Sequence, residues 1–252
     1  MSLVLARALL ATLLVTGAAT EGPGRPPADV VARLDALHLR RDDQGALAEA
    51  RRVADAAVAA SPTDYAVLWR AARERFSESD VPSRPDDERS RLGKEAYDLA
   101  ERAIAANPNG VEGHYWAALG IGSYAQGMGV LRALANGIEG KFTRPLARAT
   151  ALDVRYDHGS IPVVWAAYYL ELPWPRRDRA KAAAELERAL KINPANVRAR
   201  LYQARIAADE DHPAAARALL AAIAAAPVGA YDPPEERRVK TEAAAMARRL
   251  AR

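Results

Sequence analysis

The sequence of 252 residues contains no cysteine. Disulfide bonds, zinc sites built on thiolates and thiol catalysis are therefore excluded. Aromatic residues are scarce, at 6% of the chain, so the positions of the few large rings are informative about packing and binding. Much of the 50% hydrophobic content is alanine, which favours helix and buries little area per residue.

The chain also lacks a strong excess of one charge. It has 36 Lys and Arg against 32 Asp and Glu, a formal net charge of +4. These residues are mixed along the chain, without the long basic run that is typical of a nucleic-acid-binding tract. The composition therefore argues against nucleic acid as a partner.

One apolar stretch lies near the N-terminus, from Ala8 to Ala19, with Arg7 before it and a small-x-small pattern at Gly17 and Ala19. It is about 12 residues long, which is too short to span a bilayer and suits the core of a signal peptide. We expect a signal peptide over 1–19, a linker over 20–27 and a folded domain over 28–252. This division predicts a periplasmic or secreted protein without a stable membrane span. The alternative is a cytoplasmic protein whose N-terminus is an ordinary helix.

A ladder of mostly small residues that ends in proline recurs along the folded part. It occupies offsets 0, 4, 7, 10, 11 and 12 of the segments 50–62, 96–108 and 182–194. Small residues on one stripe let two helices lie close together, and proline ends the unit. The pattern resembles the second helix of a tetratricopeptide repeat. We expect an all-α tetratricopeptide-type solenoid of about five helix pairs, with a C-terminal capping helix from Pro233.

The pairs are interrupted in three places. The segment from Glu78 to Arg89 is rich in Pro, Asp, Ser and Arg, which predicts a solvated loop. An unusual connector runs from Gly127 to Lys141, and the fourth pair breaks at Leu172 to Arg177, where Trp174 and Arg176 could form a loop at the rim of the groove.

Catalytic patterns are not found. The segment from Gly120 to Ala125 satisfies G-x-G-x-x-A, but a helical pattern precedes it where a dinucleotide site needs a strand, so close helix packing explains its glycines better. The four histidines have no metal-ligand spacing, and neither Ser123 nor Ser160 stands in a nucleophile-elbow context. We therefore expect no enzyme activity, no cofactor and no metal site.

The few aromatic residues give a more specific prediction. In tetratricopeptide geometry, defined positions of the first helix of each pair face a concave groove. Amphipathic aromatics and arginines at such positions are typical of binding hot spots. The candidates are Trp69, Arg73, Phe76, Tyr115, Trp165, Tyr168, Tyr169, Arg198 and Arg205. The alternative is that some of them, Trp165 above all, fill gaps between adjacent helices.

The second half of the chain resembles a bacterial tetratricopeptide family related to the T component of TRAP transporters. The similar segments are Tyr115 to Leu131, Ala149 to Asp153, Tyr156 to Gly159 and Tyr169 to Pro173, and the resemblance covers about 95–250. It implies a periplasmic helical scaffold that associates with a solute-binding protein and carries ligand through a pore. Members of that family are commonly lipoproteins, whereas this sequence contains no cysteine.

The chain is also similar, more weakly, to the regulators of microtubule dynamics. The shared features are an HYW-like segment at His114 to Trp116, a PW break at Pro173 and Trp174, and a TEAA-type last helix at Thr241 to Ala244. This resemblance implies a common ancestry of the fold.

The leading functional hypothesis is a non-enzymatic exported scaffold that binds a protein, such as a periplasmic solute-binding protein, or a small solute in its concave groove. The alternative is a cytoplasmic adaptor or assembly protein related to the regulators of microtubule dynamics. Association of the chain with further copies of itself stays open in both.

Overall fold

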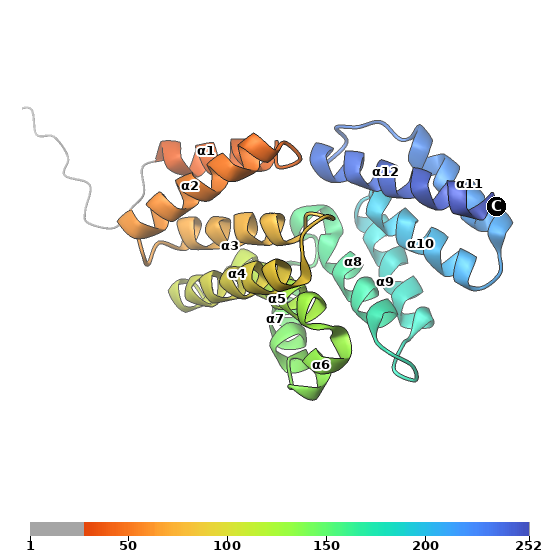
Figure 1. Ribbon diagram of the computed structural model, residues 1–252, viewed down its shortest axis with the longest axis horizontal. Helices are drawn as coiled ribbons and strands as arrows, with labels where there is room; N and C mark the ends of the chain where they lie inside the picture. Colours follow the sequence, from red (N-terminus) through yellow and green to blue (C-terminus); the bar gives the residue numbers. More distant parts are fainter. Residues whose placement is uncertain (1–27, 252) are drawn as a thin grey trace, which may run out of the picture.

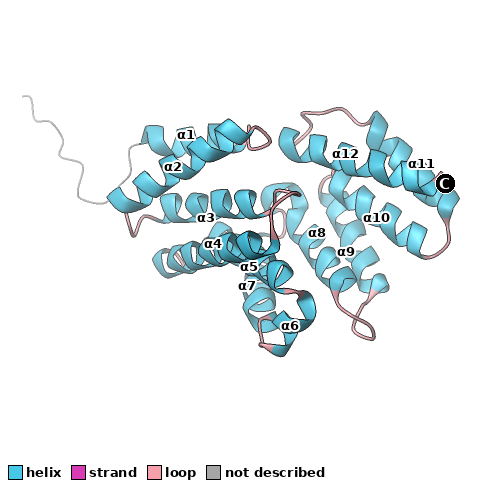
Figure 2. Ribbon diagram, in the orientation of Figure 1, coloured by secondary structure: helices cyan, strands magenta, loops and turns pink. Residues whose placement is uncertain are grey.

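The computed structural model describes residues 28–251, and the expected signal peptide (1–19) and linker (20–27) lie outside this described part. Within it the fold is all-helical, without a strand (Figures 1 and 2). In chain order the helices are α1 (Ala28–His38), α2 (Gln44–Ala60), α3 (Tyr65–Ser79), α4 (Asp86–Ala106), α5 (Val111–Met128), α6 (Val130–Ala135), α7 (Glu139–Asp153), α8 (Tyr156–Glu171), α9 (Arg179–Ile192), α10 (Val197–Asp209), α11 (Pro213–Ala225) and α12 (Pro233–Leu250).

Neighbouring helices pack as five pairs, α1 with α2, α3 with α4, α5 with α7, α8 with α9 and α10 with α11. The short α6 lies between the members of the third pair, and α12 packs on α10 and α11. This arrangement confirms the expected all-α solenoid with a C-terminal capping helix.

Polar side chains cap the N-termini of several of these helices. The carboxylates of Asp43, Asp64 and Asp178 each accept a hydrogen bond from the backbone amide three residues ahead, at 2.8, 2.9 and 2.9 Å. Asn196 does the same at 2.9 Å and begins α10. Such caps satisfy amides that have no partner inside the helix.

The first three positions of the ladder, at offsets 0, 4 and 7, are buried in all three segments, whereas Ala60 and Ala106 at offset 10 are exposed. The residues at these three positions lie between paired helices in the interior of the solenoid: Ala50, Ala54, Ala57, Ala96, Ala100, Ala103, Ala182, Leu186 and Ala189. Because these side chains are short, the helix axes approach closely and many backbone and side-chain atoms come into contact.

Glycines bring α4 and α5 into backbone contact. A Cβ atom on Gly120 would lie 2.6 Å from the backbone nitrogen of Tyr97, and one on Gly93 would lie 2.4 Å from that of Tyr124. These distances leave no room for a methyl group. Close helix packing therefore explains the glycine of the G-x-G-x-x-A segment that lies against α4.

The predicted loop from Glu78 to Arg89 is wrong at both ends. Helix α3 continues to Ser79, whose side chain is buried and hydrogen-bonds Ser123 on α5 at 2.7 Å. Helix α4 begins at Asp86, because its acidic first turn suits the positive end of the helix dipole. Only residues 80–85 connect the two helices.

The first turn of α8 is left-handed. Asp157, His158 and Gly159 have φ of +50°, +57° and +81°, so the regular helix follows Gly159. Non-glycine residues rarely adopt such angles, and the strain is held by surrounding contacts. One of these contacts is a hydrogen bond of 2.6 Å from the Ser160 hydroxyl to the Asp157 carbonyl oxygen.

The two ends of the solenoid meet. In Figure 1 the beginning of α12 lies beside the turn between α1 and α2. Three ion pairs join the beginning of α12 to the turn after α1 and to the end of α3, and we call them the clasp: Arg41 with Asp232 at 2.5 Å, Asp42 with Arg237 at 2.6 Å, and Asp80 with Arg238. The apolar clusters of residues 28–251 lie on either side of this junction, so charged side chains hold it together.

Within the described residues, no helix is both long and apolar enough to cross a membrane.

Candidate functional site

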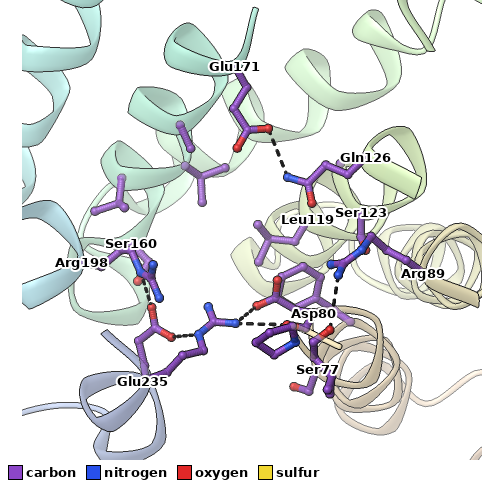
Figure 3. Close-up of a pocket in the computed structure, with 18 of the residues that line it drawn as sticks. Ser77, Asp80, Arg89, Leu119, Ser123, Gln126, Ser160, Glu171, Arg198 and Glu235 are labelled. Atoms are coloured by element: carbon purple, nitrogen blue, oxygen red, sulfur yellow. Dashed lines mark hydrogen bonds and ion pairs between the residues drawn. The ribbon is translucent and has the colours of Figure 1, made fainter. Parts of the chain in front are cut away.

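The curved solenoid lines a central cavity that is open to solvent and has a volume of about 860 Å³. Its walls come from helices of every pair and from α12, so the closure of the two ends also closes one side of the cavity. Figure 3 shows some of its polar side chains, which come from several helices: Ser77 from α3, Gln126 from α5, Glu171 from α8, Arg198 from α10 and Glu235 from α12. Cavities of this size are typical of sites that bind small molecules.

One wall of the cavity is apolar and comes mainly from α5 to α8. Its larger side chains are Phe76, Trp116, Leu119, Val130, Leu134, Ile138, Phe142, Val163 and Val164. The ring of Trp116 contacts that of Phe76, with centroids 5.7 Å apart, and that of Tyr115, at 5.0 Å. These contacts fix the rings and give the wall a rigid surface.

The opposite wall is charged and is built on Glu235 of α12. Its carboxylate accepts a hydrogen bond from Arg198 at 2.7 Å and from Arg238 at 2.9 Å (Figure 3). Arg238 in turn pairs with Asp80 of the clasp. Burial by itself raises the pKa of Glu235, but the two guanidinium groups outweigh it and lower the pKa to about 2. The carboxylate is therefore charged at neutral pH.

Glu242 extends this network along α12. Arg198 binds its two carboxylate oxygens at 2.7 and 3.0 Å, and Arg205 binds one of them at 3.0 Å. The side chain of Arg205 is much more exposed than that of Arg198. Since a guanidinium carries five N–H donors, Arg205 keeps donors for a ligand.

A third polar group lies where α5 and α8 approach each other. The amide of Gln126 donates a hydrogen bond of 3.3 Å to the carboxylate of Glu171 (Figure 3). Burial raises the pKa of Glu171 above its ordinary value.

His38 adds an ionisable group near Trp116. Its Nδ1 lies 3.3 Å from a carboxylate oxygen of Glu74, which is fully buried and also pairs with Arg73 at 2.8 Å. Burial lowers the pKa of His38, and the charge of Arg73 lowers it further. The imidazole is therefore neutral at pH 7, with the ring on the cavity wall.

Five of the nine predicted groove residues line the cavity: Phe76, Tyr115, Tyr168, Arg198 and Arg205. The hydroxyl of Tyr115 donates to Asp157 at 3.3 Å, and that of Tyr168 donates to Glu139. Burial, together with the bond to Glu139, raises the pKa of Tyr168 to about 12.

The other four lie outside the cavity lining. Trp69 is covered by the guanidinium of Arg70, 4.0 Å from its ring centroid, while Arg73 is buried and pairs with Asp35 at 2.9 Å. Trp165 donates its indole N–H to Thr150 at 3.0 Å and stacks on Tyr169. The position of Trp165 between α7 and α8 agrees with the alternative that it fills a gap between helices. Whether any of the nine binds a partner stays a prediction.

Sequence reasoning missed the contribution of α12 and the clasp. Glu235, Arg238 and Glu242 stand in a segment expected to be a solvated cap, and Asp80 stands in an expected solvated loop. The mixture of acidic and basic residues at 235–242 is common on any exposed helix. No local signal shows that this face meets residues from the opposite end of the chain.

No cluster of three or more potential metal ligands occurs among residues 28–251.

Comparison with known proteins gives one family. Residues 30–157, about half of the chain, match the family described as regulator of microtubule dynamics protein 1-3. No curated protein sequence matches the chain. The match runs from α1 to the left-handed turn of α8 and includes the apolar cavity wall up to Phe142. The weaker of the two resemblances is thereby confirmed, and the one to the TRAP transporter component is not. The chain belongs to the regulator of microtubule dynamics family.

Proposed function

We propose that this protein is a non-enzymatic binding scaffold whose central cavity holds a small solute with an apolar body and a polar end. The observation that carries the proposal is the division of a cavity of about 860 Å³ into one apolar wall and one charged wall. A solute of this kind matches both walls at once. A fully polar solute would leave the apolar wall unmatched.

The apolar wall would supply most of the binding free energy. Each Å² of apolar surface removed from water contributes roughly 25 cal/mol, before the costs of ordering the ligand. The walls are rigid because Trp116, Phe76 and Tyr115 pack on one another, so little side-chain ordering remains to be done. A preformed site of this kind favours tight binding.

The charged wall would orient the solute. Its carboxylates and guanidinium groups are already matched to each other, as in the group of Arg198, Glu235 and Arg238. A polar end that binds Arg205 would therefore not have to break the central network. The orientation follows from the chemistry: the polar end points to α10 and α12, and the apolar body points to α5 and α8.

Binding of 1-anilinonaphthalene-8-sulfonate, an apolar probe with an anionic end, tests the proposal. We expect saturable binding with an increase in the fluorescence of the probe. Native mass spectrometry of the protein with the added probe should show one bound probe molecule. Ala167→Phe places a ring into the cavity from α8 and should weaken binding at least about tenfold. Ala184→Phe, at an exposed site on α9, is the matched control.

Two results would contradict this function. One is probe binding that Ala167→Phe leaves unchanged while circular dichroism shows intact helices. The other is probe binding that does not saturate, because a nonspecific surface would behave in that way.

A second candidate function comes from family membership. The name of the matched family refers to regulation of microtubule dynamics, and we propose an adaptor that binds microtubules as the second candidate. Co-sedimentation of the purified chain with polymerised tubulin is the test. Saturable recovery in the pellet supports this candidate, and recovery no greater than without microtubules rejects it.

A further inference from the structure

One edge of the molecule combines exposed apolar side chains with exposed positive charge. It consists of residues 129–144, which contain α6 and the first part of α7, and residues 172–179, the loop between α8 and α9. We call these two segments the basic rim. In Figure 1 both reach the lower edge of the molecule. Contacts tie them together, since Glu139 at the start of α7 pairs with Arg176 of the loop and accepts a hydrogen bond from Tyr168.

Two large apolar side chains of the basic rim project into solvent. Trp174 is 89% exposed and Leu131 is 71% exposed, the two highest values among the exposed large apolar residues of the described chain. The other three tryptophans are buried or half-buried. A nearly fully exposed indole lacks the hydrophobic stabilisation that burial would give. Such exposure is typical of a surface that binds another molecule or a membrane. Prolines on both sides of Trp174 restrict the backbone that presents it.

The charge of the basic rim is distinctly positive. It contains six basic residues and two acidic ones, an excess of four that equals the net charge of the whole chain. All six basic side chains are exposed: Arg132, Lys141, Arg144, Arg176, Arg177 and Arg179. The two acidic residues are half-buried, and Glu139 is already engaged by Arg176 and Tyr168. Arg176 pairs with Glu139, and Arg179 lies 3.8 Å from the carboxylate of Asp209 outside the rim. An incoming surface therefore meets the positive charge of the other four: Arg132, Lys141, Arg144 and Arg177.

We propose that the basic rim docks on the surface of a lipid bilayer that contains anionic headgroups, with Trp174 and Leu131 inserted at the interface. Tryptophan prefers the headgroup region of a bilayer, where its ring is shielded and its N–H stays solvated. Clustered Lys and Arg bind anionic lipid, and apolar anchors add a second, independent source of affinity. Neither source alone holds a protein stably on a membrane.

This contact needs no membrane-spanning helix, and it is independent of what the cavity binds. The basic rim does border the cavity, because Val130, Leu134 and Leu172 on its inner side belong to the cavity lining. Docking would therefore bring this border of the cavity close to the bilayer.

Binding to vesicles of phosphatidylcholine, with and without phosphatidylserine, tests the proposal. We expect co-sedimentation with the anionic vesicles, and weaker binding as salt is raised. The emission of Trp174 should shift to the blue and be quenched by brominated phospholipid. Trp174→Phe should keep the binding and lose the quenching.

Variants separate the two sources of affinity. Trp174→Ala, and separately Arg132→Glu with Lys141→Glu, should each reduce vesicle binding at least about tenfold. The matched controls lie elsewhere on the surface: Leu39→Ala removes another exposed apolar side chain, and Arg248→Glu with Arg249→Glu reverses two charges at the end of α12. We expect the controls to bind as the unchanged protein does.

The proposal is overturned by absence of vesicle binding, or by binding that persists in both basic-rim variants. Binding to poly-glutamate without binding to vesicles also overturns it, in favour of an acidic polypeptide as the occupant of the rim. Because these assays do not report on the cavity, their failure leaves binding of the anilinonaphthalene probe unaffected.

Discussion

Arg41 and Asp232 are 191 residues apart in sequence, yet their side chains form an ion pair of 2.5 Å. With Asp42–Arg237 and Asp80–Arg238, this pair completes the clasp that joins the turn after α1 and the end of α3 to the beginning of α12. An open solenoid has contacts only between neighbouring repeats. Here the clasp adds a contact between the ends, and its six residues form part of the cavity lining.

The clasp should open at high ionic strength, because partly exposed ion pairs are screened while the apolar contacts between helix pairs are not. Since the chain contains no cysteine, Arg40→Cys and Ala230→Cys would provide the only two thiols for a fluorescent donor and acceptor. Energy transfer should fall as salt is raised, with little change in helicity. Each pair should contribute about 0.2–1 kcal/mol to the free energy of unfolding.

A charge swap controls for nonspecific effects of salt. Arg237→Asp alone should lower energy transfer, and Arg237→Asp together with Asp42→Arg should restore it. Equal transfer in all three proteins at low salt would show that the pair does not hold the ends together.

Removal of Glu74 should destabilise the fold strongly. Its carboxylate is fully buried and binds the Nε of Arg73, so Glu74→Ala leaves that buried donor without its partner, and Asp35 stays as the carboxylate partner of Arg73. We expect a loss of about 1–3 kcal/mol in the free energy of unfolding, measured by urea denaturation. Glu187→Ala, at an exposed site on α9, should change stability by less than about 0.5 kcal/mol. A loss for Glu74→Ala no larger than that of the control would contradict the buried pairing.

Gly120→Ala should separate α4 from α5. The added methyl would lie 2.6 Å from the backbone nitrogen of Tyr97, and a backbone atom cannot move aside alone. We expect a loss of about 1–3 kcal/mol. Gly140→Ala is the control, because the nearest neighbouring atom to a Cβ there is the side-chain Nε of Arg144, 3.8 Å away. This variant should be as stable as the unchanged protein or more stable, since alanine favours helix. Thermal unfolding of both variants tests this prediction. Equal melting temperatures would contradict the close contact between α4 and α5 at Gly120.

Acid should weaken the charged wall of the cavity. The folded-state pKa of Glu235 is about 2, below its ordinary value of 4.5, so the folded protein holds the proton less tightly than the unfolded chain does. The stabilisation is therefore present above pH 4.5 and is lost as pH falls toward 2. Denaturation curves should show a smaller loss of stability with acid for Glu235→Gln than for the unchanged protein. Parallel curves would refute the role of this carboxylate.

Local sequence patterns account for the helix pairs. The stripe at 96, 100 and 103 predicts which face of α4 is buried, and proline at 108 predicts where that unit ends, as found. Polarity alone misplaced the boundary at Asp86, since an acidic segment is typical both of a loop and of the first turn of a helix. The positions of Phe76, Tyr115 and Arg198 within their repeats also predict that these side chains face the concave side, and all three line the cavity.

The contact between the two ends of the solenoid is visible only in the tertiary structure. Whether a solenoid stays open or closes depends on small rotations that accumulate from pair to pair, and no single segment encodes their sum. Asp80, Glu235 and Arg238 acquire their shared role from that accumulated curvature. The sequence by itself therefore determined the helices, their pairing and their buried faces, because these depend on residues a few positions apart. The central cavity and its charged wall depend on contacts 158 to 195 residues apart, which only the tertiary structure brings about.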